Sequence, residues 1–273
     1  VLRLSWLSDE GTGVDELSGQ LNRFIDEYEE WSRGLLSEHT DIQEHLSGAR
    51  DRLLDRIDHA ITSMRSGVAS LLTNNEALQA FKLANRAMLL QMERSRPATR
   101  EHVWRPFQLG YQLLALESLI NEDHPDRESV DLLWVPTGGG KTEAYLMLTA
   151  FEIFRRRLIY GDSGSGTTVI TRYTLRLLTT QQFQRASALI CACESIRRNQ
   201  TDTLGANPIT IGLWVGQSTS PNTYQEANRV YLDLLSQQIP SNPFQIMECP
   251  WCSASMVPER QSEPQHYGFT ATN

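Results

Sequence analysis

The stretch from Val130 to Leu146, VDLLWVPTGGGKTEAYL, constrains this chain more than any other. The apolar run at residues 130–135 predicts a short buried strand that ends at Pro136. A glycine-rich turn follows, and a long helical pattern opens at Lys141. Glycines accept positive φ and carry no side chain, so several backbone N–H groups can converge on one small anion. The stretch therefore predicts a phosphate-binding loop.

The side chains around this turn suit a nucleoside triphosphate with its magnesium ion. We expect the phosphates to be cradled by the residues of the turn, Thr137, Gly138, Gly139 and Gly140. Lys141 can reach the outer phosphates, and the Thr142 hydroxyl can complete the shell of a Mg²⁺ ion. Val135 stands where the G-x-x-x-x-G-K-[ST] pattern has glycine, but phosphate is bound by the loop after this position. The alternative is a glycine-rich surface turn that happens to precede Lys-Thr.

A second element lies upstream of the loop, where R-P-F-Q opens an apolar helical pattern. Its Gln108 lies 33 residues before Lys141. A glutamine amide has both a donor and an acceptor, so it can bind the N6 and N7 edge of adenine. The ring of Phe107 can pack on the base. Upstream of a phosphate loop, these two residues predict an adenine-reading element.

Composition and charge set the outer bounds. The chain has 273 residues with 40% hydrophobic content, which predicts a globular protein of one large or two ordinary domains. It contains no apolar run long enough to cross a bilayer and no signal-peptide pattern, so we expect no membrane partner and a cytoplasmic location. It begins without Met, which suggests that the natural N-terminus is missing.

The acidic balance belongs to the first part of the chain. Residues 1–80 hold 15 acidic and 7 basic side chains, whereas residues 81–273 hold 18 of each. Net charge therefore does not exclude a nucleic-acid partner for the second part. Basic residues gather between Lys82 and Arg105, where Pro97 interrupts the helical pattern. This cluster is either a solvated connector, which we favour, or part of a phosphate-contacting face.

The two parts differ in their periodicity. Residues 14–70 and 75–94 place apolar side chains at steps of three and four, which predicts an α-helical N-terminal domain over residues 1–100 with a packing role. After residue 101, apolar runs at 130–135, 167–171 and 209–216 alternate with helical patterns. This alternation predicts an α/β fold, a parallel sheet with flanking helices, over residues 101–273.

Four cysteines in a chain without an export signal indicate metal ligands or core residues rather than disulfides. Cys249 and Cys252 form a C-x-x-C turn that suits a structural zinc knuckle. Two thiolates are half a site, and we expect the other ligands beyond Asn273, with residues 245–273 as the start of a zinc-ribbon-like insertion. Cys191 and Cys193 lie two apart in a helical pattern and so point to different faces. A thioredoxin-like redox pair is the alternative.

The motifs together resemble a known family. R-P-F-Q followed by P-T-G-G-G-K-T resembles the nucleotide-binding half of superfamily 2 helicases and translocases. The segments WVPTGGGKTEAYL, TRYTLRLLTTQQFQRASALICACE, IGLWVGQSTSPN and NPFQIMECPWC are similar to the helicase subunit of the DISARM anti-phage defence system. The resemblance covers about residues 75–252, and the phosphate loop is its most specific part.

The resemblance implies a RecA-like lobe that binds ATP and Mg²⁺ and acts on DNA with a single-stranded region, beside a second defence-system subunit. The segment after residues 167–171 is similar to a motif that touches the sugar-phosphate backbone, which implies nucleic-acid contacts for Arg172, Thr174 and Arg176. No apolar strand ending in Asp-Glu follows the loop, so we expect this fragment to bind nucleotide without hydrolysing it. A non-hydrolysing ATP-controlled assembly module and a P-loop phosphotransferase are the alternatives.

Overall fold

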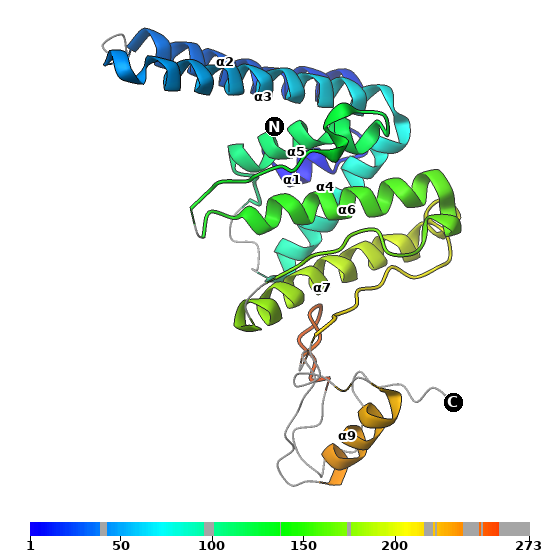
Figure 1. Cartoon of the computed structure of the whole chain (residues 1–273). Helices are drawn as coiled ribbons and strands as arrows, with labels where there is room; N and C mark the ends of the chain where they lie inside the picture. The colour runs from blue at the N-terminus through cyan, green and yellow to red at the C-terminus, as the bar shows by residue number, and fades with distance from the viewer. Residues whose placement is uncertain are drawn as a thin grey trace. The chain divides into compact units, whose positions relative to one another are not determined.

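The protein is described by a computed structural model whose secondary structure is helical (Figure 1). The structure describes all residues except 39–42, 96–100, 137, 174–175, 216–220, 222, 237–245, 247 and 257–273. The described chain forms two compact units. The first comprises Val1–Val169 with Ile196–Asn207, and the second comprises Ile170–Ser195 with Pro208–Asn273.

The first unit holds most of the helices, and its long ones are α2, α3, α4, α5 and α6. Their bounds are Val14–Glu38, Ser47–Thr73, Asn75–Ser95, Pro106–Ile120 and Lys141–Tyr160. Short helical turns lie between and after them: α1 Leu4–Leu7, η1 Glu44–Leu46, η2 Pro125–Glu128, η3 Gly161–Gly164 and α8 Thr201–Leu204. The helices predicted from the periodicity of residues 14–70 and 75–94 are present.

Helix packing in this unit is organised around α5. Helix α5 packs against α3 and α6, α4 packs against α6, and α2 packs against α3. The apolar residues of these faces are fully buried, among them Phe81 of α4, Leu113 of α5 and Phe151 of α6. Trp104, just before α5, is also buried and donates its indole N–H to Asn85 Oδ1 at 2.8 Å. The buried indole is thus satisfied, as burial of a polar group requires.

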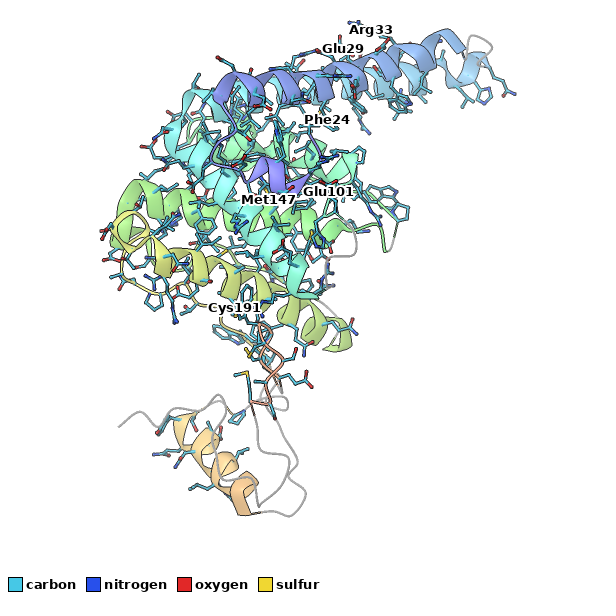
Figure 2. The ribbon with its side chains drawn as sticks, turned by 180° about the vertical axis from the view of Figure 1, so that it is seen from behind. Phe24, Glu29, Arg33, Glu101, Met147 and Cys191 are labelled. Atoms are coloured by element: carbon cyan, nitrogen blue, oxygen red, sulfur yellow. The ribbon has the colours of Figure 1, made fainter. Side chains whose placement is uncertain are left out.

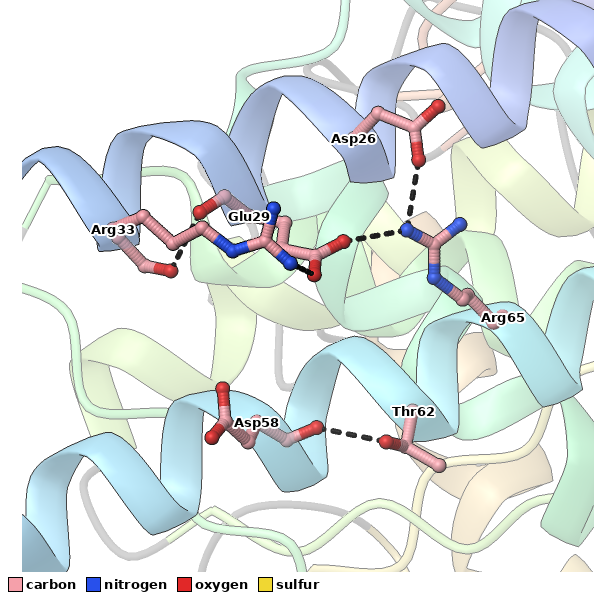
Figure 3. A network of polar contacts seen from close by, with 7 residues as sticks. Asp26, Glu29, Arg33, Asp58, Thr62 and Arg65 are labelled. Carbon is pink, nitrogen blue, oxygen red and sulfur yellow. Dashed lines mark hydrogen bonds and ion pairs between the residues drawn. The ribbon is translucent and has the colours of Figure 1, made fainter.

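Helices α2 and α3 run side by side as a long hairpin (Figure 1). An ion-pair network joins them (Figure 3): the Arg65 guanidinium contacts Asp26 and Glu29, each at 2.7 Å, and Glu29 also binds Arg33. The two helices share a core only at one end. On α3 the buried residues all lie between Ile61 and Leu71, so the first half of this helix has no core behind it.

The second unit contains most of α7 and all of α9, with bounds Arg176–Asn199 and Tyr224–Ser236. Apolar side chains of α7, including Leu189 and Ala192, are buried. Further along the chain than α9, a tight turn at residues 248–255 is closed by an antiparallel bridge between Glu248 and Ser255.

The predicted α/β fold with a parallel sheet is wrong. In the described part of the chain there is no strand, and the β-type pairings are two isolated bridges, Arg3–Val103 and Glu248–Ser255. The apolar runs at 130–135, 167–171 and the described part of 209–216 lie outside regular secondary structure. Their large side chains reach the surface instead of a core, as Val130, Leu132 and Trp134 show at 94, 80 and 87% exposure.

The physical reason is that a strand needs neighbours. An apolar run predicts burial, but a strand also requires an adjacent extended segment whose N–H and C=O groups pair with its own. In the first unit the apolar faces of α4, α5 and α6 cover one another, and the segment at 130–135 makes no such ladder. The RecA-like architecture implied by the resemblance is therefore wrong as well, because it is built on a parallel sheet.

In the part of the chain that the structure describes, no helix has both the length and the apolar character needed to span a membrane.

The contact between α3 and α5 generates a test of this packing. A Cβ added at Gly67 would lie 2.0 Å from the Leu113 carbonyl oxygen, whereas one added at Gly19 of α2 would meet nothing within 4 Å. We expect Gly67→Ala to lower the free energy of unfolding by about 1–3 kcal/mol, because the helices must separate. The matched variant Gly19→Ala should raise it by roughly 0.5–1 kcal/mol, because alanine favours the helix. Urea denaturation measures both, and equal effects would contradict the close approach.

Candidate nucleotide-binding site

The glycine loop leads directly into α6. Gly140 is the residue before the helix and has φ of 90°, and Gly138 has φ of 80°. Both values lie in the left-handed region that favours glycine. A Cβ at Gly139 would lie 2.6 Å from Val135 Cγ1 and 2.9 Å from the Pro136 carbonyl oxygen. The turn therefore needs glycine at all three positions, and it delivers the chain to the N-terminus of a 20-residue helix, where backbone N–H groups have no partner within the helix.

The beginning of α5 holds this loop in place. The Gln108 side chain donates from Nε2 to the Gly140 carbonyl oxygen at 2.7 Å and accepts at Oε1 from the Arg105 backbone N–H at 2.8 Å. The Arg105 guanidinium donates to the Gly139 carbonyl oxygen, also at 2.7 Å. Gln108 is 4% exposed, so its two hydrogen bonds are shielded from water. Two loop carbonyls thus point toward α5, which fixes the shape of the turn.

Lys141 folds back over the loop. Its ammonium donates to the Val135 carbonyl oxygen and, at 3.2 Å, to that of Pro136. These are two oxygens from the start of the loop, so the positive charge lies beside the turn rather than in open solvent. An anion in the loop would meet this charge together with the positive end of the α6 dipole. In the next turn of α6, the Tyr145 hydroxyl contacts Thr142 Oγ1 at 3.2 Å.

The structure brings together most of the residues predicted for nucleotide binding. Gln108, the glycines and Lys141 form one cluster within the first unit. Phe107 is half-buried in the first turn of α5. Thr137 lies outside the described residues, so its predicted place in the phosphate cradle stays a prediction. The adenine-reading role of Gln108 also stays a prediction, because the structure shows its amide bound to the loop and contains no nucleotide.

Sequence reasoning missed Arg105. The sequence pattern gives it no role beyond the start of a helix, but its guanidinium reaches 34 positions along the chain to Gly139. The position of Arg105, three residues before Gln108, could have identified it. Side chains three residues apart lie on the same side of a helix, so both can contact the same loop. A residue flanking Pro106 at the helix start is also held in extended conformation, and Arg105 has φ −72° and ψ 146°.

The residues predicted to contact nucleic acid are less well defined. Arg172 is exposed and lies in the second unit. Thr174 lies outside the described residues, and of Arg176 the structure gives its position as the first residue of α7. These contacts remain predictions.

The predicted metal ligands Cys249 and Cys252 lie in the tight turn of the second unit. The Cys249 N–H donates to the Ala254 carbonyl oxygen at 2.8 Å, and the Ser253 N–H donates to the Cys249 carbonyl oxygen at 2.9 Å. Burial raises the pKa of the Cys249 thiol, but hydrogen bonds from the Cys252 and Trp251 backbone N–H groups and from the Cys252 side chain outweigh it, so its pKa is lowered. This turn therefore favours a thiolate, the form that binds metal.

The other two cysteines are separated by their positions on α7, as their spacing predicted. Cys193 is fully buried, and burial raises the pKa of its thiol strongly. Burial also raises the pKa of Cys191, with smaller contributions from Cys249 and Cys252. Among the side chains that the structure describes, no group of three His, Cys, Asp or Glu residues is arranged to hold a metal ion. The zinc site stays a prediction that rests on the C-x-x-C turn.

The loop geometry predicts the effect of Gln108→Ala. Because both amide atoms bind the chain, we expect the variant to weaken binding of ATP and of inorganic tripolyphosphate by the same factor. Gln112→Ala is the matched control, since this glutamine lies one turn further along α5 and its side-chain amide makes no hydrogen bond. Isothermal titration of both ligands measures the factors. A loss confined to ATP would instead support adenine reading.

The thiol environments predict an order of alkylation. At neutral pH, iodoacetamide should modify Cys249 well before Cys193, because the thiolate is the nucleophile and Cys193 is buried with a raised pKa. Added Zn²⁺ should protect Cys249 and Cys252 if the turn binds metal. Peptide mass spectrometry gives the rates, and alkylation in denaturant provides the control in which the difference vanishes. Early modification of Cys193 in the folded protein would contradict this structure.

Comparison with known proteins finds a relative that aligns with nearly the whole chain. No protein-family profile matches the chain. It is 35% identical over 290 aligned positions to the DISARM protein DrmA of Bacillus paralicheniformis. The alignment covers 96% of this chain and 25% of the relative, so the chain spans about a quarter of that protein's length. The chain is therefore a homologue of the DISARM protein DrmA over one part of its sequence.

Proposed function

We propose that this chain is the nucleotide-binding part of an ATP-dependent superfamily 2 DNA helicase or translocase that acts in anti-phage defence. The observation that carries the proposal is the glycine loop at the N-terminus of α6, braced by Arg105 and Gln108 and covered by Lys141. Homology to a DISARM protein supports the defence context.

The residues present fit a triphosphate with Mg²⁺. The loop from Thr137 to Gly140 and the N-terminus of α6 would bind phosphate oxygens through backbone N–H groups. Lys141 would leave the carbonyl oxygens of Val135 and Pro136 and neutralise charge on the γ-phosphate. The Thr142 hydroxyl would help to hold a Mg²⁺ ion, which would offset negative charge on the triphosphate. Gln108 would shape the loop, and Phe107 would pack beside the base.

The proposal places DNA on the second unit. Arg172, Thr174 and Arg176 are its candidate backbone contacts, since hydroxyl and guanidinium groups bind phosphate without reading sequence. A zinc ion on Cys249 and Cys252 would stabilise the turn that carries them. A second defence-system subunit is the proposed protein partner. Hydrolysis requires further acidic groups to hold Mg²⁺ and orient water, so we expect this chain by itself to bind ATP without turnover.

A second candidate function is a non-hydrolysing assembly module in which ATP controls the binding of a partner protein. The outer part of the α2–α3 hairpin favours it, because this part has little core behind it and is exposed on both helices. The two candidates differ in one measurement. DNA-stimulated ATP hydrolysis by the longer protein supports the helicase, and ATP-dependent partner binding without DNA supports the module.

The two lysines of the sequence provide a direct test of the site. Lys141→Ala should weaken ATP binding about 10- to 100-fold, the effect of losing a hydrogen bond to a charged phosphate. Lys82→Ala is the matched control. Lys82 Nζ donates to the Thr12 carbonyl oxygen at 2.8 Å, remote in sequence from the loop, so ATP affinity should be retained. Fluorescence titration with a labelled ATP analogue measures both variants. Equal affinity of Lys141→Ala and the unmodified chain would remove the basis of the proposal.

A further inference from the structure

A row of large apolar side chains follows one side of α2. Phe24, Tyr28, Trp31 and Leu35 recur at steps of four, three and four, which aligns them on a helix. We call them the apolar ridge; at 1.5 Å per residue it is roughly 16 Å long. Phe24, marked in Figure 2, is half-buried, whereas Trp31 is 54% exposed. The Tyr28 and Trp31 rings are stacked, with centroids 5.5 Å apart.

The ridge continues the stripe of α2 that builds the core, because Leu17 and Leu21 precede Phe24 at steps of four and three. At the inner end of the helix, Leu17, Leu21 and Ile25 are fully buried. Beyond Ile25, Ser32 is the one buried residue among the described side chains of α2. The ridge thus continues along a part of the hairpin that has lost its core. Clustered aromatic side chains at such a place indicate a binding surface, because apolar patches of soluble proteins are usually covered.

The charges around the ridge define the chemistry of what covers it. Helix α2 carries seven acidic side chains and two arginines, and α3 beside it carries three aspartates and four arginines, so the hairpin keeps a net charge of −4. Both arginines of α2 are already paired on the same helix, Arg23 with Glu27 and Arg33 with Glu29. Glu30, next to Trp31, is exposed. The surface therefore presents aromatic rings in a negative field, which attracts a positively charged partner.

This combination excludes several kinds of occupant. Nucleic acid and anionic lipid headgroups carry the same sign of charge as α2, so both would be repelled. A second copy would bring one acidic helix against another. A straight ridge with helical spacing fits between the side chains of another helix, as in helix-in-groove recognition.

We propose that the apolar ridge of α2 binds an amphipathic helix of a separate protein whose apolar face is flanked by lysines and arginines. This inference deepens the proposed function by giving the protein partner a surface and a chemistry. It does not depend on the nucleotide site: the ridge lies on α2, and the hydrogen bonds that define the glycine loop come from α5 and α6.

The first experiment is site-specific photo-crosslinking in bacteria that express the longer protein with the proteins encoded beside it. A benzophenone amino acid replaces Trp31, and the control replaces Tyr160, an exposed aromatic residue at the end of α6 in the same unit. We expect an adduct with another protein from position 31 alone. Sequencing the crosslinked peptide should reveal apolar residues at steps of three or four with flanking Lys or Arg.

The second experiment measures affinity with the purified protein so identified. Trp31→Ala should weaken binding about tenfold or more, as expected for a central aromatic anchor, whereas Tyr160→Ala should leave it unchanged. Added salt should weaken binding further. Thermal unfolding verifies that both variants remain folded.

Several results would overturn the inference. These are the absence of an adduct from position 31, an adduct within the same polypeptide, an acidic or nucleic-acid adduct, and unchanged affinity of Trp31→Ala. ATP affinity separates this inference from the nucleotide-binding proposal. Lys141→Ala should lose ATP binding and retain the crosslink, whereas Trp31→Ala should lose the partner and retain ATP.

Discussion

The candidate site depends on hydrogen bonds between the start of α5 and the glycine loop. Glycines permit many backbone conformations, so a loop of three has no fixed shape of its own. Gln108 and Arg105 each hold one loop carbonyl, which selects a single conformation from many. Because Gln108 is buried, its bond is protected from competing water. The loop is thereby shaped before any anion arrives, and a preorganised site loses less entropy on binding.

The position of α5 has its own physical basis. Gly67 lets α3 approach so closely that any side chain there would strike the α5 backbone. Just before α5 begins, the buried side chain of Trp104 is hydrogen-bonded to Asn85 of α4, and this contact fixes the chain there. Helical packing thus places Gln108 where it meets the loop. In this way α3 and α4 contribute to the geometry of the site although they supply no residue to it.

The hairpin of α2 and α3 and the segment at 130–135 both present apolar side chains to solvent, but for different reasons. The ridge on α2 belongs to a formed helix with an ion-pair network beside it (Figure 3). Its conformation does not require a partner, so the ridge is suited to reversible binding. The segment at 130–135 has no regular secondary structure and no strand pairs with it. Its large apolar side chains are therefore exposed, and their apolar character alone did not make a strand.

The sequence alone determined the N-terminal helices and the position of the glycine loop. Apolar residues at steps of three and four sufficed for α2 to α4, because this period is a local property. Three glycines before Lys141 sufficed to locate a turn at a helix start. The tertiary structure decided which segments paired. It left 130–135 without a sheet and brought Arg105 to Gly139. Those outcomes depend on contacts between residues distant in the chain, and no local pattern records them.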